Sequence, residues 1–152
     1  MDSLRFYFSL LAAKTAYRAL QLTRLSAGTS IIGRYVLKLC PDFLKQCNPY
    51  ISTKINVTGT NGKTTTSGLI THLIKESGKS VINNAMGANM LTGVVNAVAV
   101  SLNPCEQTDF SVIESDEAYL AKIYDQFEAD YLIVTNLFRD QLDRYGELAT
   151  TK

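Results

Sequence analysis

A glycine-rich run between a β-rich segment and a helical segment is the strongest chemical signal in the sequence. The apolar stretch 55–57 leads into T-G-T-N-G-K-T-T at residues 58–65, after which a helical pattern begins. Glycines let a backbone turn tightly and approach an anion without a Cβ in the way. Successive N–H groups and the positive end of the helix can then point at phosphate. The predicted phosphate contacts are Gly59, Thr60, Asn61, Gly62, Lys63, Thr64 and Thr65.

Two side chains of this run have chemistry beyond the backbone. Lys63 would neutralise the charge of the β- and γ-phosphates and is a candidate catalytic residue, and the Thr64 hydroxyl would ligate Mg²⁺. The general phosphate-loop pattern requires glycine five residues before Gly62, where this chain has Val57, so the run is a narrower variant. The alternative is a simple turn that enters a helix. A Gly-Lys-Thr triplet between a β-run and a helix favours phosphate binding.

A carboxylate follows the apolar run 110–113. Glu114 at this strand end would lie beside the phosphate loop in a parallel sheet, where it could hold Mg²⁺ directly or through water and take part in catalysis. Capping of the following helix is the rival explanation for Glu114. Asp116 and Glu117 are more simply interpreted as acids at a helix N-terminus, which the helix dipole favours.

Dense polar residues follow a third apolar run, at positions 135–146. They could line a nucleotide or substrate cleft, or form a solvated loop with a capped helix, and the residues alone do not separate the two. A small polar stretch at 83–89 is similarly open between a second loop facing the cleft and an ordinary turn. The candidate nucleotide contacts at the third strand end are Asn136, Arg139 and Asp140.

Alternating β-rich and helical runs must position these groups. Strands are expected at 54–57, 80–83, 110–113 and 131–134, with helices ending near Ser77, over 90–100 and near 117–127. This order predicts an α/β fold with a mainly parallel sheet of βαβ units, in which ligands gather at the C-terminal ends of the strands. In the first helix, Leu69, Ile70, Leu73 and Ile74 are expected to be buried and His72 solvated or structural.

The first 50 residues predict helices that precede this sheet. One runs from about Leu4 to Leu25, a second from near Ile31 to just before Pro41, and residues 42–53 resemble a connection. We interpret the first helix as amphipathic; it could pack on its own domain, on a partner or on a membrane surface, and packing on protein is the simpler interpretation. The chain is accordingly divided into 1–50 and 51–152.

Composition excludes several classes of protein. A formal charge of +1 gives no general attraction for a polyanion, so nucleic-acid binding has no electrostatic support. Three cysteines without C-x-x-C spacing argue against a disulfide framework and a complete zinc site, and fit a reducing cytoplasm. Charged residues interrupt the apolar N-terminal stretch before it reaches the roughly 20 apolar residues of a spanning helix.

The four elements together resemble the Mur ligase superfamily: the run 58–65, Glu114 at a strand end, Thr135-Asn136, and D-Q-L-D-R-Y-G at 140–146. Within it, the chain is most similar to MurT-like ligase subunits of lipid II isoglutaminyl synthase, on residues 28–30, 87–90 and 136–147. The resemblance implies a Mur ligase central ATP-binding domain, here incomplete, with ATP and Mg²⁺.

The activity that the resemblance implies is ATP-dependent amidation of the D-glutamate α-carboxylate in the stem peptide of lipid II, a peptidoglycan precursor. ATP would phosphorylate the carboxylate, and ammonia from a glutaminase partner subunit would displace the phosphate. The resemblance therefore implies a heterodimer in the cytoplasm, acting on lipid II at the inner face of the cell membrane.

Two departures from the family pattern qualify this expectation. Gln141 stands where typical Mur ligases carry a metal-binding histidine, which makes a second metal there doubtful and fits the MurT branch. MurT-like proteins are also longer, with a zinc ribbon, so zinc is expected only downstream and the present chain alone is expected to be inactive. The alternatives are a folylpolyglutamate-type or amino-acid-adding Mur ligase and a non-catalytic nucleotide-binding module.

Overall fold

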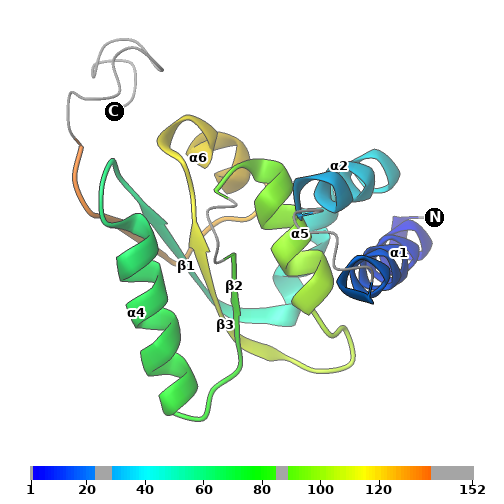
Figure 1. Cartoon of the computed structure of the whole chain (residues 1–152), viewed down its shortest axis with the longest axis horizontal. Coiled ribbons are helices and arrows are strands. Elements are labelled where there is room, and N and C mark those ends of the chain that lie inside the picture. Colours follow the sequence, from blue (N-terminus) through cyan, green and yellow to red (C-terminus); the bar gives the residue numbers. More distant parts are fainter. Residues whose placement is uncertain (1, 23–28, 85–88, 138–152) are drawn as a thin grey trace.

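The computed structural model describes residues 2–22, 29–84 and 89–137. Three N-terminal helices precede four strands that alternate with helices (Figure 1). In chain order the elements are α1 (Asp2–Leu22), α2 (Thr29–Leu39), α3 (Phe43–Cys47), the 3₁₀ turn η1 (Asn48–Tyr50), β1 (Ile51–Thr58), α4 (Lys63–Glu76), β2 (Val81–Asn83), α5 (Leu91–Ser101), β3 (Thr108–Glu114), α6 (Glu117–Tyr124) and β4 (Tyr131–Val134).

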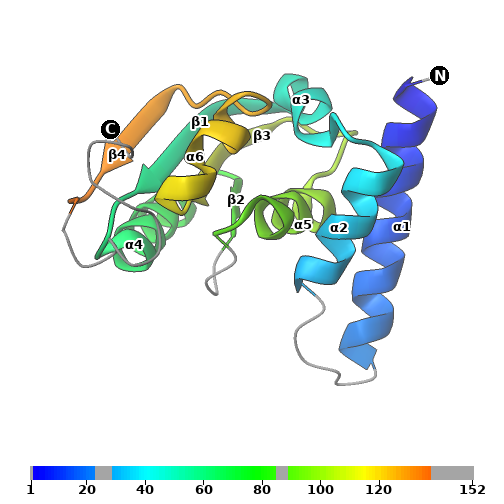
Figure 2. The ribbon, with the colours of Figure 1, turned by 90° about the horizontal axis from the view of Figure 1, so that it is seen from above.

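All four strands are parallel, in the order β2-β3-β1-β4. The connections are therefore βαβ crossovers, as the alternation of runs predicts, and the α/β class is confirmed. Helix α4 lies on one face of the sheet, and α5 and α6 lie on the other (Figures 1 and 2). The central pair, β1 and β3, ends at Thr58 and Glu114, which places the two main chemical segments of the sequence at one edge.

The segment between α2 and β1 is more ordered than predicted. Residues 42–53 contain α3, η1 and the start of β1 in place of an irregular connection. The reason is apolar burial: Phe43, Leu44 and Cys47 are completely buried, and Ile51 begins the pairing of β1 with β3 opposite Thr108. Five residues are too few for a helical period to stand out in a sequence.

The N-terminal helices form successive layers outside the sheet. Helix α2 packs on α5, and α1 packs on both (Figure 2). One continuous apolar cluster joins Phe6 and Leu10 of α1 to Val94 of α5 and Ile113 of β3. The expectation that α1 packs on its own domain is thus confirmed, while the division into 1–50 and 51–152 stays a prediction.

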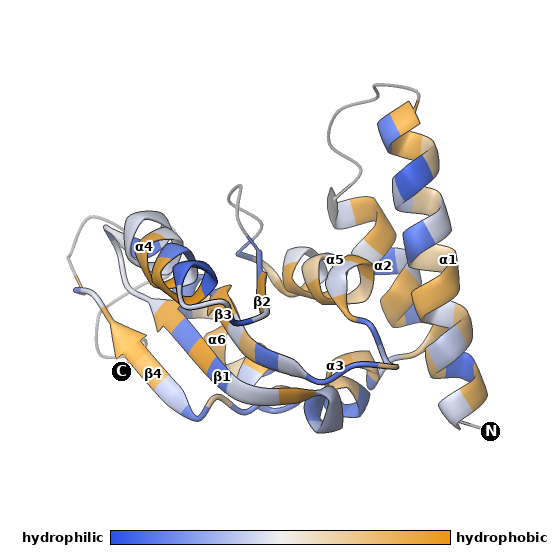
Figure 3. Cartoon of the chain, turned by 90° about the horizontal axis from the view of Figure 1, so that it is seen from below, coloured by the Kyte–Doolittle hydropathy of each residue, from blue (hydrophilic) through white to orange (hydrophobic). Residues whose placement is uncertain are grey.

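Helix α1 differs from the predicted amphipathic pattern because it is apolar on two opposite faces. Phe6, Leu10 and Ala13 are buried in the core, whereas Leu4 and Phe8 are exposed. Figure 3 shows apolar residues along the whole helix, with hydrophilic positions between them. Among the described residues, no helix is long and apolar enough to cross a membrane.

The orientation of α4 also differs from the prediction. Leu69 and Leu73 are 58% and 60% exposed, and the buried positions are Lys63, Ser67 and Thr71. These three lie four residues apart and so share one face of the helix. Lys63 is buried in the first turn of α4, and the hydroxyl residues Ser67 and Thr71 extend the buried face along the helix. His72 is exposed, as its interpretation as a solvated residue requires.

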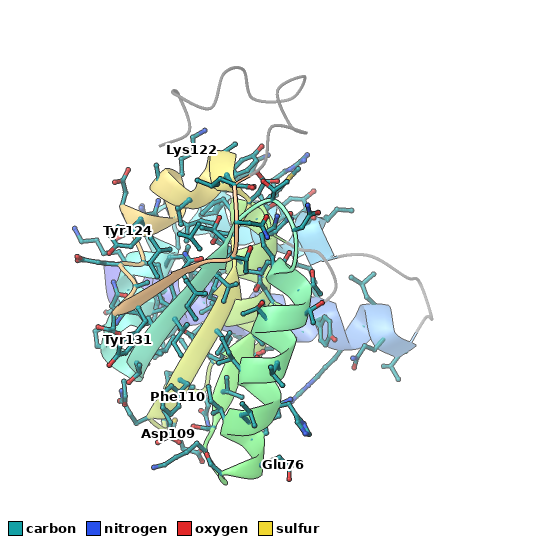
Figure 4. The ribbon with its side chains drawn as sticks, turned by 90° about the vertical axis from the view of Figure 1, so that its left-hand side faces the viewer. Glu76, Asp109, Phe110, Lys122, Tyr124 and Tyr131 are labelled. Carbon is teal, nitrogen blue, oxygen red and sulfur yellow. The ribbon has the colours of Figure 1, made fainter. Side chains whose placement is uncertain are left out.

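Strand β4 is the exposed edge of the described sheet. It pairs with β1 from Ile55 to Thr58, and Tyr131, Leu132 and Val134 are each about half exposed or more, between 47% and 62%. Figure 4 shows Tyr131 on this strand, beside β1. Asp130 fixes the start of the strand, because its carboxylate accepts a 2.7 Å hydrogen bond from the Lys54 N–H. That hydrogen bond is the main reason why the pKa of Asp130 is lowered.

Candidate phosphate-binding site

A tight loop joins the end of β1 to the start of α4. Gly59 has φ = 126°, and a Cβ there would lie 2.3 Å from Thr135 Oγ1 and 2.6 Å from the Asn136 carbonyl oxygen. Only glycine can adopt this backbone conformation readily and also lie this close to residues 135 and 136. Val57, at the position where the general pattern has its first glycine, is instead a completely buried residue of β1. Gly59 begins the loop in this chain.

The N-terminus of α4 presents backbone donors that need a partner. Its N-cap is Gly62, with φ = 85°, and no described side chain caps the helix. The first N–H groups of a helix have no partner within the helix and carry its positive partial charge. An anion such as phosphate would satisfy them, so the loop fits the predicted ligand.

Lys63 lies over this loop. Its side chain is 10% exposed, and Nζ donates to the carbonyl oxygens of Gly59 and, at 3.3 Å, Thr60. Among the described residues, the carboxylate paired with Lys63 is that of Glu117, whose Oε2 is 3.8 Å from Nζ and whose side chain is 7% exposed. Glu117 stands in the first turn of α6, as predicted, but it also faces Lys63, which the sequence interpretation missed.

Glu114 meets the start of α4 across the sheet edge. The Thr64 hydroxyl donates to Glu114 Oε2 at 2.9 Å, and Glu114 is 4% exposed. The cap of α6 is Asp116, whose Oδ1 accepts from the Ala118 N–H at 3.1 Å, so the rival explanation of Glu114 as the cap is wrong.

Hydroxyl and carboxylate oxygens are ligands that Mg²⁺ accepts, and the Thr64–Glu114 pair fits that ion. No group of three His, Cys, Asp or Glu residues able to hold a metal occurs in the part of the chain that the structure describes. Mg²⁺ bound with a nucleotide usually takes phosphate and water oxygens as its further ligands.

Asn84 holds Glu114 in place, and the sequence interpretation left its stretch open between a cleft loop and a turn. Its side chain accepts from the Glu114 N–H and donates to the Glu114 carbonyl oxygen, both at 2.7 Å. Asn84 is 2% exposed. Both backbone groups of Glu114 are thus paired by one amide, which restricts the carboxylate to the loop side. The available signal was an asparagine pair directly after a short apolar run.

The residues that follow β4 make hydrogen bonds with the loop between β1 and α4. The Asn136 side chain accepts from the Asn61 N–H and donates to the Asn61 carbonyl oxygen, both at 2.9 Å, and the Asn136 carbonyl oxygen accepts from the Thr60 N–H. Thr135 Oγ1 also donates to the Asn61 carbonyl oxygen, at 2.7 Å. Asn136 therefore lies at the predicted site, in contact with the loop itself. Thr65 follows Thr64 on an exposed position of α4, and Arg139, Asp140 and Gln141 lie outside the described residues.

Together, the parallel sheet, the glycine loop and the Lys63, Thr64 and Glu114 side chains define an α/β domain whose strand ends carry a loop with donors suited to an anion. Residues 57–151 match the Mur ligase middle domain, and the chain belongs to the Mur ligase family.

Relatives extend the likeness over most of the chain. It is 35% identical over 149 residues to the lipid II isoglutaminyl synthase (glutamine-hydrolyzing) subunit MurT of Streptococcus pneumoniae, covering 98% of this chain and 33% of that protein. The MurT subunit of Staphylococcus aureus is 36% identical over 121 residues, 80% of this chain and 27% of the relative. The chain thus spans about a third of the length of these relatives or less.

A solved structure supports the fold. MurF from Acinetobacter baumannii superposes with a TM-score of 0.59 over 75% of this chain and 25% of that one, at 19% identity. A likeness at this identity supports the architecture only. The predicted Mur ligase fold is therefore confirmed both by the family match and by the arrangement of the elements.

Proposed function

We propose that this chain binds the phosphates of Mg-ATP as the ATP-binding part of a Mur-type ligase. The observation that carries the proposal is the hydrogen-bonded pair Thr64–Glu114 beside the uncapped N-terminus of α4. Lys63, nearly buried over the same loop, supplies the cation. A bound Mg²⁺ would supply charge neutralisation between the phosphates and the Thr64 and Glu114 oxygens.

The proposed reaction explains why a phosphate site is needed. A carboxylate does not react with an amine at neutral pH because it lacks a leaving group. A carboxylate oxygen that attacks the γ-phosphorus releases ADP and forms an acyl phosphate; ammonia then attacks the acyl carbon, releases phosphate and loses a proton to give the amide. Charge moves onto the phosphate oxygens in the first step, where Lys63 and the N–H groups of α4 can stabilise it.

The names of the relatives support a substrate and a partner. Both MurT relatives are described as subunits of a glutamine-hydrolyzing lipid II isoglutaminyl synthase. We therefore assign the D-glutamate α-carboxylate of the lipid II stem peptide as acceptor and ammonia from a glutaminase subunit as donor. The reaction would occur in the cytoplasm at the inner face of the cell membrane, and zinc would belong to the downstream ribbon of such proteins.

Two other functions remain as alternatives. The chain is also 38% identical over 91 residues to the UDP-N-acetylmuramoylalanine–D-glutamate ligase of Christiangramia forsetii, which favours an amino-acid-adding ligase as the second candidate; a folylpolyglutamate-type ligase shares the loop as well. Gln141, in place of the histidine of those ligases, supports the amidating branch. A nucleotide-binding module without chemistry is the third candidate.

The test is isothermal titration of the chain with Mg-ATP, alongside Lys63→Ala. The variant keeps the backbone loop but removes its cation, so we expect affinity to fall by about 1.5–3 kcal/mol, the typical value of a charge-assisted contact. Unchanged affinity of Lys63→Ala for Mg-ATP would contradict the assignment of Lys63 as a phosphate contact. With a chain of the length of the MurT relatives, formation of amidated lipid II from ATP and ammonia would distinguish the amidating ligase from an enzyme that adds an amino acid. Absence of ADP formation with either ammonia or an amino acid would indicate the non-catalytic module.

A further inference from the structure

The outer face of α1 is an apolar stripe in contact with solvent. Leu4, Phe8 and Leu11 are 75%, 60% and 65% exposed, and Leu22, at the far end of the helix beyond Thr15 and Arg18, is 86% exposed. The spacing of four, then three residues puts the first three on one side of the helix, opposite the buried Phe6. Large apolar residues gathered on one exposed face, unlike single ones, indicate a surface that binds something.

A groove between α1 and α2 widens this apolar surface. It has a volume of about 410 Å³ and forms where alanines of α1, including Ala12 and Ala16, leave room beside α2. Its α2 side is formed by Ile31, Tyr35 and Leu39, of which Ile31 and Tyr35 are 59% and 62% exposed. The apolar surface therefore extends from the stripe of α1 onto α2.

The charge of this part of the chain is strongly positive. Residues 2–41 contain six Lys or Arg residues and one acid, Asp2 at the start of α1, so their net charge is +5, whereas the whole chain carries +1. None of the three ion pairs between described residues involves this segment. Arg5 and Arg18 of α1 and Arg34 and Lys38 of α2 are exposed, so their charges are available beside the apolar stripe.

We propose that the outer face of α1, with the adjoining edge of α2, docks on an anionic phospholipid bilayer. The cations would approach the headgroups while Phe8 and its neighbours enter the acyl boundary, as in helices that lie in the plane of a membrane. A second copy of the chain fits less well, because docking of two such faces would bring cations of the same sign together.

The arrangement of the fold is compatible with this docking. Helix α1 is the outermost layer at one end of the molecule, and α4 with the phosphate loop lies at the other end (Figures 1 and 2). A membrane bound at α1 would leave the loop open to nucleotide. The inference does not depend on the ligase proposal, because no residue of the phosphate loop takes part, and Lys63→Ala should bind vesicles like the unmodified chain.

The first test is sedimentation of the chain with vesicles of phosphatidylcholine alone or with about one third phosphatidylglycerol. We expect binding to the anionic vesicles that weakens as salt rises from about 0.05 to about 0.5 M. Phe8→Gln/Leu11→Gln should lower the partition coefficient at least about tenfold. The matched control is Leu69→Gln/Leu73→Gln on α4, which replaces leucines of similar exposure at the other end of the molecule and should bind normally.

A second measurement reports insertion directly and tolerates small changes in stability. The chain contains no tryptophan, so Phe8→Trp places a single tryptophan on the stripe and Leu69→Trp places one on α4; excitation at the red edge of the absorption band avoids the eight tyrosines. We expect the emission of Phe8→Trp to shift to the blue with anionic vesicles and to be quenched by brominated lipid, with no change for Leu69→Trp.

Three results would overturn the proposal. The first is absence of binding to anionic vesicles at low salt, and the second is equal emission changes at both tryptophans. The third is a dimer of the chain that persists in the presence of vesicles and that dissociates in the variant Phe8→Gln/Leu11→Gln. The stripe would then be an interface between two copies of the chain. Circular dichroism of each variant verifies that a loss of binding comes from a folded protein.

Discussion

The hydroxyl of Thr64, in the first turn of α4, lies 2.9 Å from Glu114 Oε2 at the end of β3. Fifty residues separate the two in the chain, and the parallel pairing of β1 with β3 brings them together. Asn84 pairs both backbone groups of Glu114, so the carboxylate is positioned before any ligand arrives. The pair thus holds two oxygen atoms in a fixed position beside the glycine loop, as the proposed binding of Mg²⁺ requires.

Replacing Glu114 by Gln should weaken the Mg²⁺ dependence of nucleotide binding without unfolding the chain. Glutamine keeps the shape and can still accept from Thr64, but it removes the negative charge that a cation requires. Titration of ATP binding against Mg²⁺ measures the effect, and thermal unfolding serves as control. A normal Mg²⁺ requirement together with a lower melting temperature would assign Glu114 a structural role.

Removing the negative charge of Glu117 should strengthen ATP binding. Its carboxylate lies 3.8 Å from Lys63 Nζ in a nearly buried position, so a phosphate must compete with it for the lysine and is repelled by its charge. Glu117→Gln should therefore tighten ATP binding several-fold, by about 1 kcal/mol. Isothermal titration in parallel with Glu76→Gln, a carboxylate at the far end of α4, separates this local effect from a general change of charge. Weaker binding would mean that Glu117 helps to hold Lys63 for the nucleotide.

The crossing of α2 and α5 depends on Gly33. A Cβ at this position would lie 1.8 Å from the Thr92 carbonyl oxygen, so the two helices must separate if any side chain is introduced. Gly33→Ala should destabilise the chain by about 2 kcal/mol, within the usual range for overpacking. Gly68→Ala in α4 is the matched control, since nothing lies within 4 Å of its Cβ, and it should stabilise by about 0.5–1 kcal/mol. Urea denaturation measures both, and equal stability of the two variants would contradict the prediction.

The order of the elements and the positions of the loop and of Glu114 at strand ends could be predicted from the sequence, because each depends on local patterns. Alternating apolar runs place the strands, and the Gly-Lys-Thr triplet marks the loop. The strand 131–134 is observed at the predicted positions. The place of Glu114 could be predicted because a carboxylate at the end of a parallel strand lies at the edge of the sheet where ligands gather in such folds.

The features that were missed depend on contacts between distant segments. The sequence shows leucines at 69 and 73 in a helical pattern, yet burial of Lys63 turns α4 so that Ser67 and Thr71 face inward. The pairing of Asn84 with Glu114 spans 30 residues. Such contacts are decided by strand order and helix rotation, which a single sequence does not specify.

Nucleotide binding by residues 1–152 themselves should be weak and should depend on phosphate more than on the base. The described site consists of backbone donors, Lys63 and the Thr64–Glu114 oxygens, which are groups that suit phosphate and Mg²⁺ and do not distinguish one base from another. We therefore expect ATP and GTP to bind similarly, AMP hardly at all, and no amidation even with a glutaminase added. The exposed apolar residues of edge strand β4 should also favour self-association as concentration rises. Titrations with ATP, GTP and AMP, at concentrations where light scattering finds a monomer, measure the three affinities. Tight binding selective for adenine, or any amidated product, would show that the essential site is complete within these residues.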